Sequence, residues 1–499
     1  MLIELKDVSF RYQTKSILNL CNINLHIGKG EFVVITGKSG CGKTTLSKCI
    51  NGLIPHFHEV ELTGKIFIKS RDNSQLVLHE IGQHIGSVFQ DPRSQFFTTT
   101  TTDEVSFGCR NMGLPLAEIE KRVNTAFHFF EIENLRDRSI FKLSSGEKQK
   151  IAIASCRAMR PNVYLLDEPS ANLDIASTFQ LAESLRKLKE SGATVVVIEH
   201  RLHYLKDLAD KLIYMKDGAI CEAYSKKELQ TLDNQRLLER GLRYFDLENM
   251  PCRRTHEIPK DQNISLQIED VAFKYSKNRT TREVLSRVSL SACGGEIIGV
   301  TGKNGAGKTT FAKVIMGLMN QSKGTISING ASAGSKDRLK ASYFVMQDSD
   351  YQLFADSVHT ELILGNEKVE NLMQKCDSTI SALDLSEHME THPAALSRGQ
   401  KQRLTIACGL ISGSKILIFD EPTSGLDACN MNQVTDLLVD VAKSGKLIFV
   451  ISHDYEFLIN TCTRIVSLDD GKIAEDFSMN QENQKKLYSI MIAGAKDGR

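Results

Sequence analysis

Short apolar runs recur along the chain, and each one gives way to polar or glycine-rich sequence. Four of them have the length and β-branched character of buried strands: Phe32–Ile35, Val163–Leu166, Ile297–Val300 and Ile416–Phe419. A run that is apolar at every position, instead of alternating, is typical of a strand buried on both faces of a parallel sheet. The pattern therefore predicts α/β domains in which strands alternate with helices.

Helical spacing of apolar residues appears between these runs. It predicts helices over Ile151–Met159, over Leu404–Ile411 and around residues 118–127, where the apolar positions are Ile119, Val123, Ala126, Phe127 and Phe130. Residues 226–248 also have amphipathic helical spacing, through Leu229, Leu232, Leu237, Leu238 and Leu242. We expect this last helix to pack on its own domain, with a role in pairing the two halves of the chain as the alternative.

The same order of elements occurs twice. Lys308 follows Lys43 by 265 positions and Gln347 follows Gln90 by 257. The offset is then constant at 253 for three further pairs, Gly146 and Gly399, Asp167 and Asp420, and His200 and His453. A repeat of this length means duplicated domains and not a stacked array of small repeats. We predict one domain over residues 1–248 and a second over residues 264–499, joined by a linker at residues 249–263 that contains two prolines and has no apolar periodicity.

Each half contains a glycine-rich loop between a predicted strand and a predicted helix. The pattern G-x-x-x-x-G-K-T spans Gly37–Thr44 and again Gly302–Thr309. Glycines let successive backbone N–H groups surround a polyphosphate, the lysine neutralises phosphate charge, and the threonine hydroxyl can hold Mg²⁺. The candidate nucleotide-binding residues are Gly37, Ser39, Gly40, Cys41, Gly42, Lys43, Thr44 and Thr45, and in the second half Gly302, Asn304, Gly305, Ala306, Gly307, Lys308, Thr309 and Thr310.

A pair of carboxylates ends one buried strand in each half. Asp167 and Glu168 precede Pro169, and Asp420 and Glu421 precede Pro422. At the carboxyl end of a parallel strand the first acid can reach bound Mg²⁺, and the second can face a water as general base. We assign the metal role to Asp167 and Asp420 and the catalytic role to Glu168 and Glu421.

A serine and a glycine precede a predicted helix in each half. Ser144 and Gly146 lie in Leu-Ser-Ser-Gly-Glu-Lys-Gln, and Ser397 and Gly399 lie in Leu-Ser-Arg-Gly-Gln-Lys-Gln. Such a helix start offers a hydroxyl and backbone N–H groups to an anion. Taken alone, either segment is a good helix cap and nothing more.

Composition limits the function classes. The 62 basic and 61 acidic residues nearly cancel, so no net field attracts nucleic acid, and we expect no nucleic-acid partner. The 12 cysteines show no metal-ligand spacing and suit a reducing cytosol. Cys41 lies inside the first phosphate loop and predicts sensitivity of that site to thiol reagents. No apolar run approaches the ~20 residues of a membrane span, so we expect a soluble chain that reaches membranes only through partners.

Together these segments resemble the ATP-binding cassette (ABC) family, and the resemblance covers nearly the whole chain outside the linker. The serine-glycine segments resemble its signature, and Gln90 and Gln347 resemble its Q-loop glutamine. The segments 170–174 and 423–427 resemble its D-loop, and His200 and His453 resemble its switch histidine. Tyr12 and Tyr275 resemble the aromatic residue that stacks on adenine.

The resemblance implies a fold and a mechanism. Each half would be a RecA-like P-loop NTPase core with an antiparallel β subdomain and a helical subdomain. ATP and Mg²⁺ would bind in two composite sites, each closed by the signature of the opposite half. Gln90 and Gln347 would contact the Mg²⁺ or the attacking water, and His200 and His453 the γ-phosphate. Because both glutamates and both histidines are present, we predict two competent sites.

A finer resemblance concerns the segments after the Q-loop glutamines. Gln90–Phe97 with Asp103–Gly108, and Gln347 with Tyr351–Phe354, look like the ATPases of energy-coupling factor (ECF) transporters. This likeness implies an ATPase that powers import of a vitamin, micronutrient or metal. It would sit peripherally on the cytoplasmic face of the membrane, under a membrane T component that carries a substrate-binding S component. The likeness is weaker in the second half, where Asp348-Ser349-Asp350 replaces the usual Asn/Asp-Pro.

Two other readings stay open. A fused ATPase of a sugar-type ABC importer has similar length, but such proteins usually have a weakened second site. A soluble cassette protein acting on ribosomes or DNA is the other. Ribosome factors of this kind usually have a long charged helical linker and DNA-repair members have zinc-type cysteine clusters, and the sequence shows neither.

Overall fold

The computed structural model describes residues 2–12, 18–56, 60–251, 264–277 and 280–496. It forms two compact units, Met1–Asp246 and Leu247–Arg499, each described here by itself. Most of the predicted linker, residues 252–263, lies outside the described residues. Met250, at its start, is buried, and its carbonyl accepts a hydrogen bond from the Gln484 side chain of the second unit.

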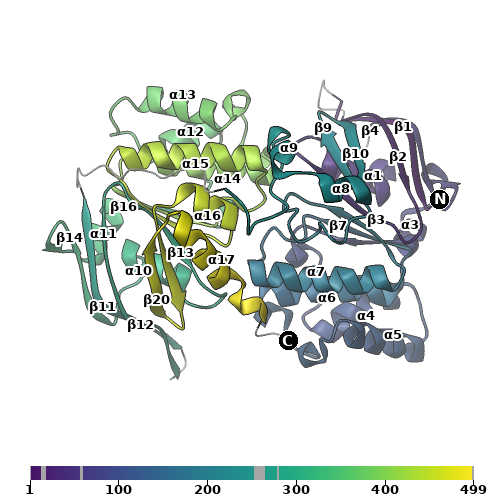
Figure 1. Cartoon of the computed structure of the whole chain (residues 1–499), viewed down its shortest axis with the longest axis horizontal. Coiled ribbons are helices and arrows are strands. Elements are labelled where there is room, and N and C mark those ends of the chain that lie inside the picture. The colour runs from purple at the N-terminus through teal and green to yellow at the C-terminus, as the bar shows by residue number, and fades with distance from the viewer. Residues whose placement is uncertain (1, 13–17, 57–59, 252–263, 278–279, 497–499) are drawn as a thin grey trace. The chain divides into compact units, whose positions relative to one another are not determined.

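The first unit alternates strands and helices as the apolar pattern predicts (Figure 1). Its strands are β1 (Ile3–Tyr12), β2 (Leu20–Ile27), β3 (Phe32–Gly37), β4 (Val60–Ile68), β5 (Arg71–Asp72), β6 (Ile85–Val88), β7 (Val163–Asp167), β8 (Thr194–Ile198), β9 (Lys211–Lys216) and β10 (Ala219–Ser225). Its helices are α1 (Lys43–Ile50), α2 (Leu53–His56), α3 (Leu78–His84), α4 (Thr101–Asn111), α5 (Leu116–Phe129), α6 (Ser145–Met159), α7 (Ile175–Glu190), α8 (Lys226–Thr231) and α9 (Asn234–Glu239).

The second unit repeats this order. Its strands are β11 (Ser265–Lys277), β12 (Thr280–Cys293), β13 (Ile297–Thr301), β14 (Lys323–Ile328), β15 (Ala331–Ser332), β16 (Ser342–Val345), β17 (Ile416–Asp420), β18 (Leu447–Ile451), β19 (Arg464–Asp469) and β20 (Lys472–Ser478). Its helices are α10 (Lys308–Met316), α11 (Ser335–Ala341), α12 (Val358–Ile363), α13 (Leu372–Ala382), α14 (Arg398–Ile411), α15 (Ala428–Lys443), α16 (Tyr455–Thr461) and α17 (Gln481–Lys496).

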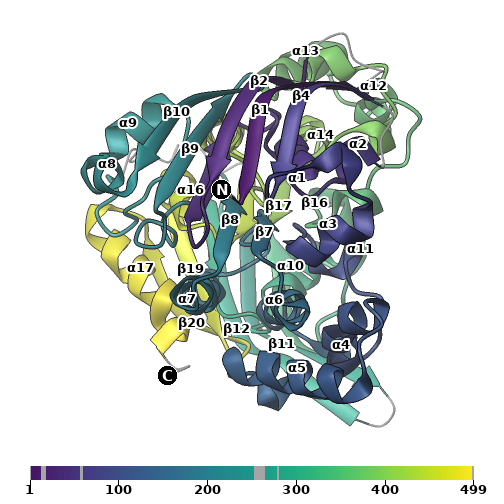
Figure 2. The ribbon, with the colours of Figure 1, turned by 90° about the vertical axis from the view of Figure 1, so that its right-hand side faces the viewer.

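The central sheet of the first unit has the strand order β10-β9-β3-β8-β7-β6, and β3, β6, β7 and β8 run parallel to their sheet neighbours. Side chains of β3 alternate between two cores. Phe32 and Val34 pack with the residues of α6 and α7, which Figure 2 shows end-on, whereas Val33 and Ile35 pack with β1, β2 and α1. Burial on both faces explains why the run is apolar at every position.

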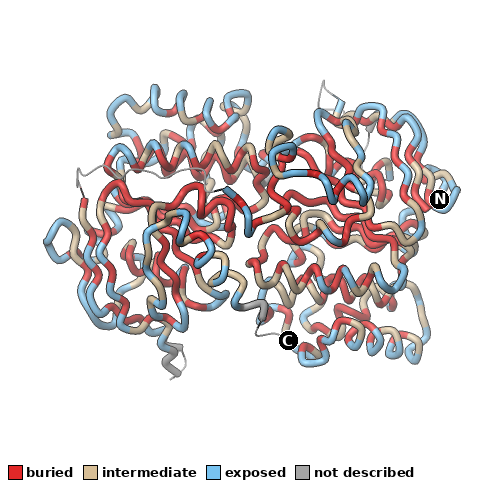
Figure 3. Tube along the Cα trace, in the orientation of Figure 1, coloured by how far each residue is buried: buried red, intermediate tan, exposed pale blue. Residues whose placement is uncertain are grey.

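Each unit also contains a smaller antiparallel sheet and a group of helices beside the central sheet. The antiparallel sheets have the orders β2-β1-β4-β5 and β12-β11-β14-β15, and the second central sheet, β16-β17-β18-β13-β19-β20, repeats the first. Helices α4 and α5 pack on α6, and α12 and α13 pack on α14. The buried segments in Figure 3 follow the strands of the central sheets. The predicted fold, two tandem α/β units of the P-loop type with a RecA-like core, an antiparallel β subdomain and a helical subdomain, is confirmed.

The single helix predicted over residues 226–248 is wrong. The chain instead forms the short helices α8 and α9, because Leu232 takes an extended conformation and Asp233 caps the next helix by accepting a hydrogen bond from Arg236 N at 2.8 Å. The leucines at 229, 232, 237 and 242 all belong to the first unit's own core. Their packing on their own domain is the outcome we expected.

In the described part of the chain, no helix combines the length and the apolar character that crossing a bilayer demands.

The core under α5 gives a test of this packing. Phe127 is fully buried in the first core, with the Arg136 guanidinium 4.5 Å from its ring centroid. We expect Phe127→Ala to lower the free energy of unfolding by ~3–5 kcal/mol, because it removes a buried ring and leaves a cavity. Urea denaturation followed by circular dichroism measures this. Leu116→Ala on the same helix, where the side chain is 68% exposed, should change it by less than ~0.5 kcal/mol.

Candidate functional site

Four loops converge on one edge of each central sheet. In the first unit β3, β8, β7 and β6 are consecutive neighbours, and register pairs Ile198 with both Ile35 and Asp167. Parallel strands place their carboxyl ends at the same edge. The glycine-rich loop, His200, the carboxylate pair and Gln90 follow these four strands, so the topology brings them together.

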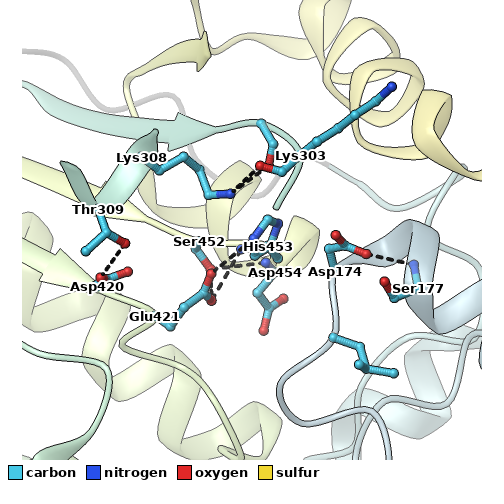
Figure 4. Close-up of polar contacts among 12 residues, drawn as sticks. Asp174, Ser177, Lys303, Lys308, Thr309, Asp420, Glu421, Ser452, His453 and Asp454 are labelled. Atoms are coloured by element: carbon cyan, nitrogen blue, oxygen red, sulfur yellow. Dashed lines mark hydrogen bonds and ion pairs between the residues drawn. The ribbon is translucent and has the colours of Figure 1, made fainter. Parts of the chain in front are cut away.

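The phosphate loop is closed by its own lysine. Lys43 is 4% exposed, and its Nζ donates to the carbonyls of Gly37 at 2.9 Å and Lys38 at 2.8 Å. Lys308 Nζ makes the same pair of bonds, to Gly302 at 2.8 Å and Lys303 at 3.0 Å (Figure 4). Carbonyl groups carry no net charge, so a buried ammonium that they hold keeps its positive charge. Such a group is suited to an anionic ligand.

Two glycines permit this loop. Gly42 has φ 101°, and a Cβ there would lie 2.6 Å from the Asn19 carbonyl oxygen. A Cβ on Gly37 would lie 2.2 Å from the Met215 carbonyl oxygen. Any side chain at these positions would push the loop away from β2 and β9, so the glycine spacing is required by close backbone approach.

The metal-assigned acids lie at the ends of β7 and β17. Thr309 Oγ1 donates to Asp420 Oδ2 at 3.0 Å, which places a hydroxyl and a carboxylate oxygen side by side. Removal from water and the neighbouring Glu168 carboxylate raise the pKa of Asp167 to about 7, and removal from water also raises the pKa of Asp420. Hydroxyl and carboxylate oxygens are the ligands that Mg²⁺ prefers, so Thr44 with Asp167 and Thr309 with Asp420 fit this ion.

The second acid of each pair points back toward the histidine. Glu168 has φ 44°, and its N–H donates to the Ile198 carbonyl at 2.8 Å. Its carboxylate lies 3.3 Å from His200 Nε2 and accepts a bond from Gln90 Nε2 at 2.6 Å. Three residues predicted from separate motifs therefore meet in one cluster.

The second unit repeats the cluster with differences. Glu421 has φ 52°, and one of its carboxylate oxygens lies 3.7 Å from His453 Nε2. Its other oxygen accepts bonds from Ser452 Oγ at 3.4 Å and His453 N at 3.3 Å (Figure 4). Gln347 is exposed, whereas Gln90 is half-buried. The two sites thus share their chemistry but not every contact.

The remaining predicted residues lie on the rim of these clusters. The hydroxyl of Tyr275, a side chain that is 43% exposed, is 3.5 Å from Thr310 Oγ1 beside the phosphate loop. Tyr12 packs edge-on against Phe10, as Tyr275 packs against Phe273. Cys41 is buried, with its sulfur 3.9 Å from Lys43 Nζ.

The signature serines cap helices. Ser144 Oγ accepts from Glu147 N at 3.3 Å and Ser397 Oγ accepts from Gln400 N at 3.4 Å, and in return each residue-147 or residue-400 side chain accepts from the serine N–H. Both serines are exposed at the start of α6 and α14. Their own contacts are those of a helix cap.

A second repeated arrangement follows the Q-loop glutamines, and sequence motifs alone did not reveal it. Buried Glu104 accepts from Phe97 N at 3.0 Å and Thr98 N at 2.9 Å, and buried Glu361 accepts from Phe354 N at 2.8 Å and Ala355 N at 2.7 Å. Glu104 and Glu361 are 257 positions apart, the offset of Gln90 and Gln347, so a register comparison could have found them.

These glutamates fix the backbone of two loops that carry exposed aromatic side chains, and the ring of Phe97 stacks on that of Phe107 with 5.1 Å between centroids. Phe97 is 75% exposed and Phe354 is 77% exposed. Gln95 and Gln352 tie the same loops to the sheet, through bonds to Ser87 O at 3.0 Å and Phe344 O at 2.6 Å. In the first unit a pocket of about 480 Å³ adjoins this loop, and its lining includes Phe97 itself, Phe107, Met112 and Met159. We call Phe97, Phe354 and their loops the exposed aromatic loops.

The fold and the site together define an ATPase of the P-loop class, with Mg²⁺ as the usual partner ion of its ATP. Comparison with known proteins then places it more closely. The family model described as ABC transporter matches residues 20–171 and 285–424, and the chain belongs to this family.

Named relatives agree with this assignment, and a solved structure agrees with the fold. The chain is 42% identical over 97% of its length to a protein of Treponema denticola named "Putative ABC transporter ATP-binding protein", covering 98% of that protein. It is 32% identical to a protein of the same name from Methanosarcina mazei, covering 95% of this chain and 88% of that one. An archaeal ribosome recycling factor, solved with a ribosomal stalk protein, has a TM-score of 0.62 at 20% identity, covering 97% of this chain and 92% of the other. At that identity the likeness shows the fold alone.

The raised pKa of Asp167 predicts a stability cost at neutral pH. An acid with a folded-state pKa near 7 must lose its proton in the folded protein above that pH, whereas in the unfolded chain it does so near 4. Its contribution to stability is therefore complete below pH 4 and is lost as pH rises to about 7. In magnesium-free buffer at pH 8 we expect Asp167→Asn to raise the free energy of unfolding by on the order of 3 kcal/mol.

Urea titrations at pH 4.5 and 8 test this. The gain should shrink toward the lower pH, and the exposed Asp207→Asn should show no such trend. An equal gain at both pH values would contradict the assignment of the buried charge to Asp167.

Proposed function

We propose that this chain is the ATP-hydrolysing subunit of an ECF-type importer of a vitamin, micronutrient or metal. Its partners would be a membrane T component and a substrate-binding S component, and it would work peripherally on the cytoplasmic face of the membrane. The observation that carries this proposal is the pair of exposed aromatic loops. The backbone of each is bonded to a buried glutamate and lies close in sequence to a Q-loop glutamine, which fits a surface that receives a membrane partner and transmits its binding to the ATP site.

Within this proposal the residues have defined roles. Lys43 and Lys308 bind the phosphates, Thr44 and Thr309 hold Mg²⁺ with Asp167 and Asp420, and Glu168 and Glu421 act as general bases. Tyr12 and Tyr275 stack on adenine. The serine and glycine of each signature complete the ATP site of the other cassette, with residues 249–263 linking the domains 1–248 and 264–499.

The chemistry of one site follows from its contacts. Glu168 can accept a proton from an attacking water, and His200 beside it can contact the transferred phosphoryl group. Mg²⁺, when bound, neutralises charge on the phosphates. Loss of the γ-phosphate would remove the contact that holds the two cassettes together, so hydrolysis would open the pair.

A sugar-type importer ATPase is the alternative within the same family. The two histidine–glutamate pairs favour the ECF function. Both units contain the histidine and the glutamate, whereas sugar-importer ATPases usually have a weakened second site. The identity of the membrane proteins that purify with this chain would distinguish an ECF importer from a sugar importer. If this chain purified with ribosomes and not with membranes, the non-transport alternative would be favoured.

Removing both general bases tests the assigned chemistry. We expect Glu168→Gln with Glu421→Gln to slow ATP hydrolysis by ~10²–10⁴-fold, because an amide cannot accept the water's proton. ATP binding should remain, and the cassettes should stay closed on ATP, which analytical ultracentrifugation or small-angle scattering would detect as a more compact form. Native hydrolysis by the double variant would refute the general-base assignment.

Replacing the exposed aromatics tests membrane docking. We expect Phe97→Ser with Phe354→Ser to reduce co-sedimentation with membranes of the native host by ~30-fold, the effect of losing a binding hot spot of about 2 kcal/mol. ATP affinity should not change, since neither ring contacts the phosphate loop. Leu116→Ser, also strongly exposed, is the control and should leave sedimentation unchanged.

A further inference from the structure

The two switch histidines have different neighbours. His200 lies between Glu199 and Arg201, whereas His453 lies between Ser452 and Asp454. The acid thus precedes the histidine in the first unit and follows it in the second. Both versions are buried, so the exchange affects the interior of each site and not its surface.

Glu199 is surrounded by donors. It is 2% exposed, and one oxygen accepts from His200 N at 2.7 Å and Arg201 N at 3.1 Å. The other accepts from the Tyr204 hydroxyl at 2.8 Å and from Ser170 N at 3.3 Å. Four donors compensate the buried charge, so this carboxylate holds the backbone on both sides of the histidine.

Arg201 extends the same connection. It is 9% exposed, and its Nη1 donates to the carbonyls of Ser170 at 3.3 Å and Leu173 at 3.0 Å. The turn from Ser170 to Leu173 follows Glu168 and leads to Asp174, which caps α7. Glu199 and Arg201 therefore attach the histidine segment to the turn that follows the general base.

The second unit holds its histidine by another acceptor. His453 N donates to Glu421 Oε2 at 3.3 Å, so the general base itself takes the bond that Glu199 takes in the first unit. Ser452 Oγ donates to the same oxygen and accepts from Asp454 N at 3.0 Å. Asp454 in turn accepts from Thr423 Oγ1 at 3.3 Å.

The supporting residues change together. Tyr204 corresponds to Phe457 at the offset of 253, and the hydroxyl that bonds Glu199 is absent where serine replaces the glutamate. Ser170 corresponds to Thr423, so a hydroxyl is present in both turns. Each unit thus carries a self-consistent set, Glu199–Arg201–Tyr204 in the first and Ser452–Asp454–Phe457 in the second.

We propose that Glu199 is a positioning residue of the first ATP site. It takes over the histidine backbone N–H from the general base and, with Arg201, fixes His200 against the turn after Glu168. The backbone of His200 is then held by Glu199 and not by the Glu168 carboxylate, which contacts only the ring, whereas the backbone of His453 is held by Glu421. This inference rests on the proposed roles of the glutamates and histidines.

The test isolates the first site in the full chain. With Glu421→Gln in the background, steady-state ATP hydrolysis reports Glu168 and His200. Adding Glu199→Gln replaces an acceptor oxygen by an amide group that cannot accept from its donors. We expect kcat to fall by ~10-fold or more while KM for ATP changes by less than ~3-fold, because the phosphate loop is untouched.

Glu222→Gln is the matched control. Glu222 is also a carboxylate bonded to a tyrosine hydroxyl and an arginine, Tyr224 and Arg240, but it lies on the edge strand β10. It should leave both kcat and KM of the same background unchanged. An equal fall in the control would mean that the loss reflects general destabilisation, and this would overturn the proposal.

A rescue variant separates positioning from folding. Glu199→Ser alone should lower kcat as Glu199→Gln does. Converting the whole set with Glu199→Ser, Arg201→Asp and Tyr204→Phe should restore kcat to within ~3-fold, since Asp at position 201 gains the Ser170 hydroxyl as Asp454 has Thr423. An unchanged kcat in the single variants, or no recovery in the triple one, would overturn the proposal.

The background also distinguishes this inference from the proposed function. If Glu421→Gln alone abolished all hydrolysis, the first site would not be independently competent, and the prediction of two competent sites and the inference about Glu199 would both be overturned. If that background hydrolysed ATP and the Glu199 variants matched it, only the positioning role would fail.

Discussion

Parallel pairing of β3, β8, β7 and β6 is the constraint on which the site depends. None of the motifs that follow these strands is adjacent to another in the chain, and each alone has a simple structural reading. The ladder register places their ends at one sheet edge, so that Glu168, His200 and Gln90 come into contact at the edge where the phosphate loop also begins. A shift of one strand by one residue would turn its side chains to the other face and dissolve the cluster.

Buried charge is the second theme. Lys43 is held by carbonyls, Glu199 by four donors, and Asp167 has the neighbouring Glu168 as a like charge. Charges in a low-dielectric interior interact strongly, so an arrangement that suits a metal and a polyphosphate is costly without them. The site therefore favours ligand binding at the expense of the stability of the empty protein.

The two units share the residues assigned to ATP binding and hydrolysis, but they differ in the residues that hold the histidine segments in place. The phosphate loops of the two units make the same lysine contacts, and Glu104 and Glu361 hold equivalent loops with equivalent bonds. The residues that contact the two histidine segments differ together. The buried Glu199 carboxylate is accompanied by the Tyr204 hydroxyl as a donor, whereas Ser452 at the equivalent position is accompanied by Phe457, which has none. Single exchanges would leave a buried group without a partner, so the sets are expected to change together.

The sequence alone determined the tandem α/β fold, the phosphate loops and the carboxylate pairs. These depend on local rules: continuous apolar runs for strands buried on both faces, and glycines where backbones approach closely, as at Gly42. It failed for residues 226–248, where one capping aspartate divides a regular apolar pattern into two helices. Only the tertiary structure decided that Glu199 bonds Ser170 and Tyr204, that Glu104 holds Phe97, and that Gln90 reaches Glu168. These contacts join segments that are distant in the chain, and their geometry is set by strand order and packing, which no local pattern encodes.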